Sequence, residues 1–173
     1  QMIYADHAAT TKLDIDAFEA MKPFLLECYG NPSQKYSFSR ETRKVIRKAR
    51  EDIAECIGAC PEEIFFTSGG SESNNWIIKG YSCGEKYVKH IITSNIEHHA
   101  ILNSVKSEVK KGRADALYLP ADDKGIVQPD KLEKALIQLQ NRGYSSQSQL
   151  VSVMLANNEI GTIQPIKELT EIS

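Results

Sequence analysis

The sequence lacks the features that mark nucleic-acid-binding, membrane-spanning and secreted proteins. Its 21 basic and 23 acidic side chains give a net charge of -2, with no polybasic block to neutralise phosphate backbones or anionic lipid. No apolar run approaches the roughly 20 residues that span a bilayer, and the N-terminus lacks the charged-then-apolar layout of a secretory signal. We therefore expect no nucleic acid and no membrane among its partners, and a cytoplasmic location.

Cysteine is sparse and has no paired spacing. The four cysteines include no CxxC pair, and a reducing compartment would keep them as thiols. Cys56 and Cys60 lie four residues apart on a helical pattern and could form half of a metal site, but a second pair of ligands is lacking. We predict no metal site.

The remaining composition, 41% hydrophobic and 25% charged in 173 residues, is that of a globular protein with one core. Apolar spacing predicts helices over residues 14–29, 39–57, 71–80, 99–111 and 129–139, and a last one from 166. Short β-rich runs predict strands at residues 63–67, 90–93, 116–119 and 150–155. This alternation predicts an α/β fold, a largely parallel sheet with helices on both faces. Residues 140–149 are rich in polar residues and predict a mobile surface loop.

Ligands of such sheets collect at the carboxyl ends of the strands, and polar clusters follow three of the predicted strands. Residues 67–72 join a strand to a helix N-terminus, where free backbone N–H groups and the helix dipole favour an anion such as phosphate. The alternative is that Ser71 caps the helix and the glycines make a tight turn.

Two further clusters follow later strands. His98 and His99 could face the same sheet edge as the glycine turn, where a histidine can stack on an aromatic ligand and pass protons, although a loop histidine can also be structural. Residues 157–159 end another strand with amide side chains that can bind a ligand or simply form a turn. Near the start, Asp6 and His7 could form a catalytic pair or a structural one.

Taken together, five blocks resemble, in order and spacing, the class V aminotransferase group, specifically the cysteine desulfurase family. The similarity covers essentially the whole chain. The matching blocks are residues 4–11, 30–33, 66–75, 97–98, and 157–161 with 164–165. The resemblance implies the large domain of a pyridoxal-phosphate (PLP)-dependent transferase of the aspartate aminotransferase type. We expect an N-terminal segment over residues 1–15 and the N-terminal part of that PLP-binding domain over 16–173.

The resemblance also implies roles for individual residues. Gly70 and Ser71 would hold the PLP phosphate, and His98 would stack on the pyridine ring and act as the catalytic acid or base. Asn158 would hydrogen-bond the 3-hydroxyl oxygen of the cofactor. His7 and Asn31 would lie on the substrate or dimer side of the site.

The family reaction converts L-cysteine to L-alanine and leaves the sulfur on an enzyme cysteine, from which an acceptor protein takes it for iron–sulfur cluster assembly or tRNA thiolation. The PLP-binding lysine and the persulfide-forming cysteine of the family come later than the stretch that matches Ser173, so these 173 residues alone are expected to be inactive and to bind PLP weakly or not at all. An incomplete sheet with an unpaired edge predicts a homodimer or oligomer. The alternatives are another class V enzyme, such as a selenocysteine lyase, or a non-catalytic binding or assembly module.

Overall fold

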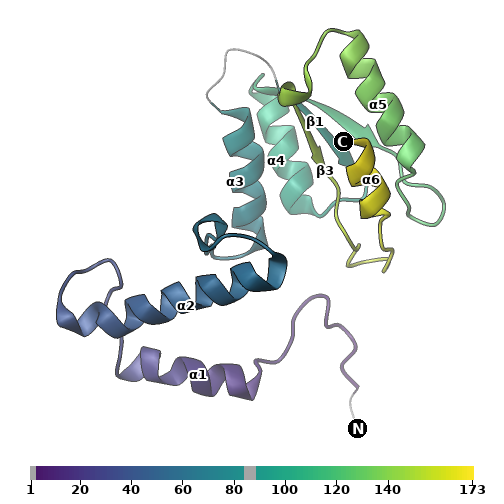
Figure 1. Cartoon of the computed structure of the whole chain (residues 1–173). Helices are drawn as coiled ribbons and strands as arrows, with labels where there is room; N and C mark the ends of the chain where they lie inside the picture. Colours follow the sequence, from purple (N-terminus) through teal and green to yellow (C-terminus); the bar gives the residue numbers. More distant parts are fainter. Residues whose placement is uncertain (1–2, 84–88) are drawn as a thin grey trace. The chain divides into compact units, whose positions relative to one another are not determined.

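A computed structural model describes residues 3–83 and 89–173. The chain separates into two compact units, Gln1–Phe66 and Thr67–Ser173, and each is described by itself (Figure 1). Within the described residues, no helix is both long enough and apolar enough to cross a membrane.

Two helices form most of the first unit. Helix α1, Ile15–Leu26, begins where the Asp14 side chain accepts hydrogen bonds from the Asp16 and Ala17 N–H groups. A short turn, η1 (Ser37–Ser39), precedes helix α2, Arg40–Ile57, which ends at Gly58 in the left-handed conformation with φ 69°. Both helices were predicted to within three residues at each end. The core of this unit is thin, because α1 buries no side chain in the described structure.

The predicted strand at residues 63–67 is wrong. Its first residue belongs to the turn η2, Pro61–Glu63, where the Glu63 carboxylate accepts a hydrogen bond from the Cys60 N–H at 2.7 Å. The Ile64 N–H donates back to the Pro61 carbonyl, and the Ile64 carbonyl accepts from Arg50 Nε of α2. The β-rich composition was therefore misleading, since these backbone groups bond to the turn and to α2 instead of to a neighbouring strand.

The second unit contains a parallel sheet, as the sequence predicts, with three strands among the described residues in place of the four expected. Its strands are β1 (Lys89–Ser94), β2 (Ala114–Leu119) and β3 (Gln149–Ser152), in the order β2-β1-β3. All six residues of the central strand β1 are buried. The prediction for β3 was too long at its carboxyl end, because pairing with β1 stops at Thr93 and Ser152.

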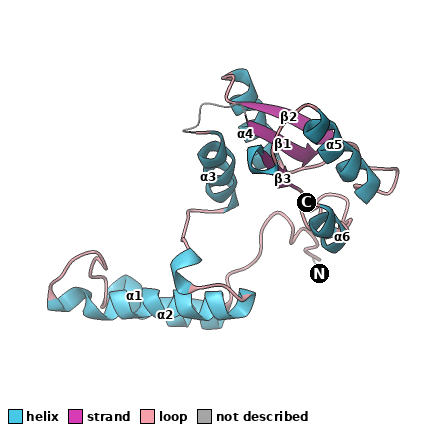
Figure 2. Cartoon of the chain, turned by 45° about the horizontal axis from the view of Figure 1, so that its top comes forward, coloured by secondary structure: helices cyan, strands magenta, loops and turns pink. Residues whose placement is uncertain are grey.

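Helices cover both faces of the sheet, which confirms the predicted fold class (Figure 2). Ile91 packs with α3 (Gly70–Ser82) and α4 (His99–Lys110) on one face. Ile92 points to the other face and packs with α5 (Pro129–Asn141) and α6 (Ile166–Ile172). Adjacent side chains of a strand point to opposite faces, so β1 serves both hydrophobic clusters.

The segment predicted as a surface loop, residues 140–149, contains fewer irregular residues than expected. Helix α5 continues to Asn141, and the turn η3 (Ser146–Ser148) leads directly into β3. Tyr144, between them, contacts the imidazole of buried His90 with ring centroids 3.9 Å apart. The segment is thus attached to the amino end of the central strand.

Candidate functional site

The connections of the sheet define where a ligand can bind. From β1 the chain passes through α4 to β2 on one side, and from β2 through α5 to β3 on the other side of β1. After β1 the chain enters α4 on one face of the sheet, and after β3 it enters α6 on the opposite face. The carboxyl ends of β1 and β3 are therefore a topological switch point, where open α/β sheets bind their ligands in a crevice between diverging loops.

His98 lies at this switch point, at the start of α4. It is the N-cap residue of that helix, and its Nδ1 accepts a hydrogen bond from the Ala100 N–H at 3.0 Å. A neutral imidazole whose Nδ1 is an acceptor carries its hydrogen on Nε2. The exposed side of the ring therefore presents a hydrogen-bond donor at Nε2, and the cap fixes the ring orientation.

The glycine turn before α3 presents free donors. The first N–H groups that bond inside this described helix are those of Glu72 and Ser73, both to the Gly69 carbonyl. The N–H groups of Gly70 and Ser71 thus have no partner within the helix, as expected of a first turn. Among the described residues, nothing lies within 4 Å of a Cβ built at Gly69 or Gly70, so a bulky ligand can approach this backbone.

The turn is held rigid by its own side chains. Glu72 Oε2 accepts hydrogen bonds from the Ser68 N–H at 2.6 Å and from the Ser68 hydroxyl at 2.7 Å. These two bonds, the backbone bond first, lower the pKa of the Glu72 carboxyl. Thr67 Oγ1 donates to the Gly69 carbonyl and lies 2.8 Å from Ser73 Oγ. The turn is therefore preorganised without using the N–H groups of Gly70 and Ser71.

Ser71 and His98 line the same hollow, of about 440 Å³, between α3 and α4. Lys79 contributes a positive charge to this hollow, and the rest of its lining is mostly polar: Asn75, His99, Ala100, Asn103, Ser104 and Ser107. The Ser71 hydroxyl and the His98 imidazole thus lie beside the N-termini of two helices, and the Lys79 ammonium group lines the hollow from the last turn of α3. This set of donors fits a phosphorylated aromatic ligand such as PLP.

Asn158 lies outside that lining. It is exposed in the turn after β3, where Gly161 adopts a left-handed conformation and its N–H donates to the Asn157 carbonyl. The neighbouring Asn157 is buried, and its Nδ2 donates to the Ile96 carbonyl at 2.9 Å. Asn157 Oδ1 accepts from the N–H groups of Glu159 and Ile160. Asn157 therefore shapes the turn, and Asn158 is the one whose amide faces solvent.

Glu97, next to His98, is a buried carboxyl group. Its Oε1 accepts hydrogen bonds from the Ser94 hydroxyl at 2.9 Å and from the Met154 N–H at 2.7 Å. Burial is the main influence and raises the pKa of this carboxyl, while the two hydrogen bonds act in the opposite direction. This side chain joins the loop after β1 to the segment after β3.

His7 and Asn31 lie in the first unit. His7 is in a turn and contacts the Tyr4 ring edge-on, with centroids 5.1 Å apart. Asn31 Oδ1 accepts from the Ser33 N–H at 2.9 Å, which is an Asx turn. Both are exposed, and the local bond of Asn31 is sufficient to explain its place in the turn.

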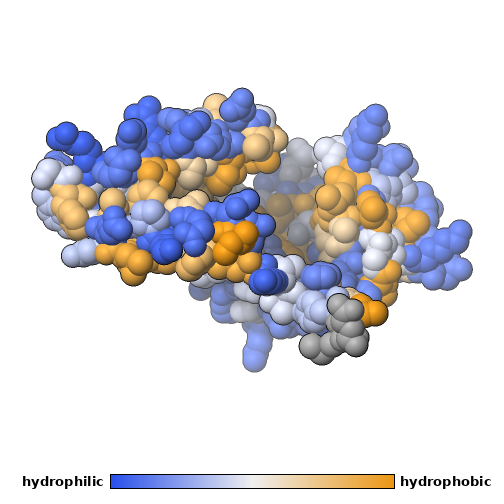
Figure 3. Space-filling model, turned by 90° about the horizontal axis from the view of Figure 1, so that it is seen from below, coloured by the Kyte–Doolittle hydropathy of each residue, from blue (hydrophilic) through white to orange (hydrophobic). Residues whose placement is uncertain are grey.

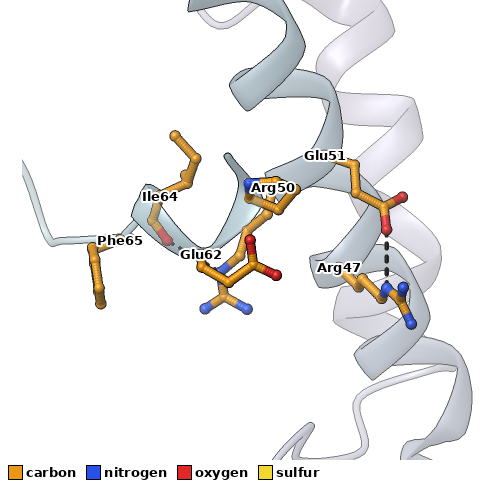
Figure 4. Close-up of a pocket in the computed structure, with 7 residues that line it drawn as sticks. Arg47, Arg50, Glu51, Glu62, Ile64 and Phe65 are labelled. Carbon is orange, nitrogen blue, oxygen red and sulfur yellow. Dashed lines mark hydrogen bonds and ion pairs between the residues drawn. The ribbon is translucent and has the colours of Figure 1, made fainter. Parts of the chain in front are cut away.

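The first unit has a hollow of its own, of about 440 Å³, between α2 and η2 (Figure 4). Its charges are largely satisfied locally. Arg47 Nε pairs with Glu51 at 2.9 Å, and the Arg50 guanidinium lies over the Phe66 ring at 5.3 Å while its Nε bonds the Ile64 carbonyl at 3.3 Å. We interpret this hollow as part of the attachment of residues 61–66 to α2.

Sequence reasoning missed two residues of the candidate site and left a third open. Glu97 stood in a matched block but was given no role, and Lys79 was read only as part of a helix. Asn157 was one of residues 157–159, for which ligand binding and a turn were both considered, and its hydrogen bonds to Glu159 and Ile160 are those of the turn. The signal for Lys79 was its spacing, because Ser71, Asn75 and Lys79 recur every four residues and share one helix face. For Glu97 and Asn157 the role depends on β3 lying beside β1, which the sequence does not reveal.

Residues 3–173 match the family model described as aminotransferase class-V. Over 172 residues the chain is 51% identical to "Cysteine desulfurase IscS" of Dictyoglomus turgidum, covering 99% of this chain and 41% of that protein. Over 173 residues it is 45% identical to "Cysteine desulfurase IscS" of Clostridium botulinum, again covering 99% and 41%. The chain thus spans about two-fifths of the length of these curated relatives.

Solved structures of similar proteins have the same fold as this chain over most of its length. A "NIFS-like protein" superposes with a TM-score of 0.87 at 41% identity, covering 96% of this chain and 44% of that one. A structure titled "SspA in complex with cysteine" has a TM-score of 0.87 at 34% identity, covering 98% of this chain and 46% of that one.

Proposed function

The chain belongs to the class-V aminotransferase family, and from this premise we propose that it forms the phosphate- and ring-binding part of a PLP-dependent cysteine desulfurase. For the whole protein we propose conversion of L-cysteine to L-alanine, with transfer of the sulfur to an enzyme cysteine and then to an acceptor protein. The observation that carries the proposal is the convergence of Ser71 and His98 on one hollow beside the β1/β3 switch point. The names of the similar relatives support the choice of reaction.

The phosphate is assigned to the first turn of α3. The N–H groups of Gly70 and Ser71 and the Ser71 hydroxyl are donors at the positive end of the helix dipole. Lys79 lines the same hollow from the last turn of the helix. An anion bound here compensates groups that otherwise rely on water.

His98 is assigned to the ring of the cofactor. PLP, when bound, supplies an electron sink that makes the Cα proton of an amino acid removable. Because Nδ1 of His98 accepts the Ala100 N–H, the imidazole can donate a hydrogen bond from Nε2 without disturbing the helix cap. A neutral imidazole that lost its Nε2 proton would become an anion, so this ring can act as an acid only after Nδ1 has released the Ala100 N–H and taken up a proton. We therefore assign His98 to ring stacking and to hydrogen-bond donation from Nε2, and its acid or base role to the state in which the cap is released.

Three further residues complete the proposal. Asn158, with its exposed amide at the other side of the switch point, would bond the 3-hydroxyl oxygen of the cofactor. His7 and Asn31 would serve the substrate side. In this proposal residues 16–173 belong to the PLP-binding domain.

We also propose self-association and a reducing compartment such as the cytoplasm. Helix α1 carries exposed apolar side chains that a second copy could cover, and apolar residues line the helices of the first unit in Figure 3. These side chains include Ile15, Phe18, Met21 and Leu25. Light scattering that finds a monomer at working concentration would contradict self-association.

All four cysteines are free thiols, which suits a reducing environment.

The test is binding of pyridoxamine 5'-phosphate, followed by its fluorescence. This probe has the ring and phosphate of PLP but no aldehyde, so it cannot form adducts with surface lysines. We expect saturable binding that inorganic phosphate displaces, about tenfold weaker binding by Ser71→Ala, and unchanged binding by the control Ser146→Ala. Absence of binding, or binding that phosphate does not displace, would overturn the assignment of the cofactor site.

A further inference from the structure

The two loops of the crevice are joined by side chains where the sheet itself stops. Backbone pairing of β1 with β3 ends at Thr93 and Ser152. Beyond it, Thr93 Oγ1 donates to the Ser152 carbonyl at 2.8 Å. Glu97 Oε1 then accepts from the Met154 N–H at 2.7 Å. Finally, Asn157 Nδ2 donates to the Ile96 carbonyl at 2.9 Å.

Glu97 is the middle of these three links, and its geometry is restrained from several directions. The side chain is only 7% exposed, and the Ser94 hydroxyl holds the same oxygen that receives the Met154 N–H. The nitrogen–oxygen distance of 2.7 Å is at the short end of the range, as expected when the acceptor carries a charge. Among the described residues its hydrogen-bond partners are a hydroxyl and a backbone amide, with no cation to neutralise it.

Stability alone gives little reason for an ionised carboxyl at this place. Burying a charge that faces only neutral partners costs free energy, and an apolar or amide side chain would avoid that cost. A charged acceptor, however, holds a backbone N–H more firmly than a neutral one does. The consequence is local: the segment that leads to Asn158 is tied to the residue beside His98.

We propose that Glu97 is a positioning residue that fixes the width of the crevice between His98 and the turn carrying Asn158. The inference rests on the proposed function for its purpose, because the crevice is where the ring of the cofactor is assigned. Without the Glu97 link, only the Thr93 and Asn157 bonds at its two ends hold the segment after Ser152 to the loop after β1. The ring then loses the fixed spacing of the groups on its two sides.

The experiment compares Glu97→Ala and Glu97→Gln with the wild-type chain by two readouts. Hydrogen exchange of the Met154 amide reports the link itself, since the Glu97 carboxylate accepts that N–H. Affinity for pyridoxamine 5'-phosphate reports whether that link contributes to binding of the cofactor ring. We expect Glu97→Ala to speed Met154 exchange and weaken binding, each about tenfold. Glu97→Gln keeps a neutral acceptor and lies between wild type and Glu97→Ala in both.

Two controls separate positioning from charge and from general destabilisation. Glu159→Gln removes an exposed charge in the same turn and leaves both readouts unchanged. Leu139→Ala opens the core on α5 and lowers overall stability, but leaves the probe affinity unchanged when measured well below its melting temperature.

The outcomes distinguish this inference from the proposed function. Wild-type exchange at Met154 in Glu97→Ala, or equal loss of affinity in Leu139→Ala, overturns the positioning role. If the wild-type chain does not bind the probe, the proposed function fails, and a role of Glu97 in the cofactor site fails with it. Accelerated Met154 exchange in Glu97→Ala would still establish the structural link in that case.

Discussion

Replacing Gln164 tests how the turn after β3 is supported. Gln164 is 3% exposed, and its side chain makes two hydrogen bonds to the backbone of the loop after β2. Oε1 accepts from the Val127 N–H at 2.8 Å, and Nε2 donates to the Gly125 carbonyl at 2.7 Å. Gln164→Leu preserves approximate volume and deletes both bonds, so it isolates the cost of two unpaired backbone groups.

The expected cost follows from those two groups. A buried backbone group left without a partner costs about 1–3 kcal/mol, so the loss is roughly 2–6 kcal/mol for the pair. That is a large fraction of the roughly 5–15 kcal/mol that stabilises a typical domain. With a urea dependence of about 2 kcal/mol per molar, the unfolding midpoint should fall by roughly 1–3 M. Circular dichroism during urea titration measures it.

Gln128→Leu is the matched control, because Gln128 is a glutamine of the same loop region with one bond to the exposed carboxylate of Asp122. We expect it to cost less than about 1 kcal/mol. A second variant, Gln164→Glu, keeps the acceptor for Val127 but cannot donate to Gly125 while ionised, and it regains stability as acid restores a donor. If Gln164→Leu unfolds at the same urea concentration as Gln128→Leu, the argument from buried backbone groups is refuted.

Three further predictions concern the same unit. Gly125→Ala and Gly112→Ala should each lower the free energy of unfolding by about 1–2 kcal/mol, because both glycines have left-handed φ (75° and 67°). The Cβ at Gly125 meets the end of the exposed Ile160 side chain, which can move aside, so a much larger fall of the urea midpoint in Gly125→Ala would contradict this reasoning. His98→Asn should keep the helix cap and His98→Ala should lose about 1 kcal/mol of it, while both lose affinity for pyridoxamine 5'-phosphate, measured by thermal melting and fluorescence. Burial is the largest influence on the pKa of His90 and lowers it below the ordinary value of 6.5. The unfolded chain therefore takes up this proton at a higher pH than the folded chain does. The contribution of neutral His90 to stability is thus present above about pH 6.5 and is lost as the pH falls toward the folded-state pKa. In His90→Gln, urea midpoints at pH 7.5 and 5.5 should therefore differ less than in the wild type; an equal difference would exclude His90 as the source.

The helices were predictable because their boundaries depend on local chemistry. Asp14 caps α1, and Gly58 ends α2 in a left-handed conformation that glycine adopts at little cost. Pro129 begins α5 at a position where its missing N–H is harmless. Each of these signals lies within a few residues of the boundary that it sets.

The strands were less predictable because pairing decides them. Residues 63–67 have the composition of a strand, yet Arg50 of α2 and the turn η2 take their backbone bonds. At the end of β3 the Met154 N–H bonds Glu97, so the strand stops at Ser152 although its apolar run continues. Composition shows that a segment suits a sheet, but not which partner its backbone will find.

The residues of the candidate site also differ in whether local sequence or strand pairing determines their roles. Ser71 and His98 were predicted because each follows a strand-like run and precedes a helix, a local pattern that favours the carboxyl edge of a sheet. The strand order β2-β1-β3, by contrast, comes from non-local packing. It alone brings residues 153–160 beside residues 95–98. The roles of Glu97 and Asn157 therefore became visible only in the folded chain.

The acidic residue of the glycine turn is compatible with a phosphate site for a specific reason. Glu72 lies in the first turn of α3, where an ionised carboxylate could compete with a phosphate for the free N–H groups. Its carboxylate is instead directed back to the Ser68 N–H and hydroxyl, and these bonds keep its pKa low. The carboxylate is thus satisfied two residues before the helix, at Ser68, while the donors of Gly70 and Ser71 stay available. The electrostatic balance at Ser71 therefore depends on the helix N-terminus, which favours an anion.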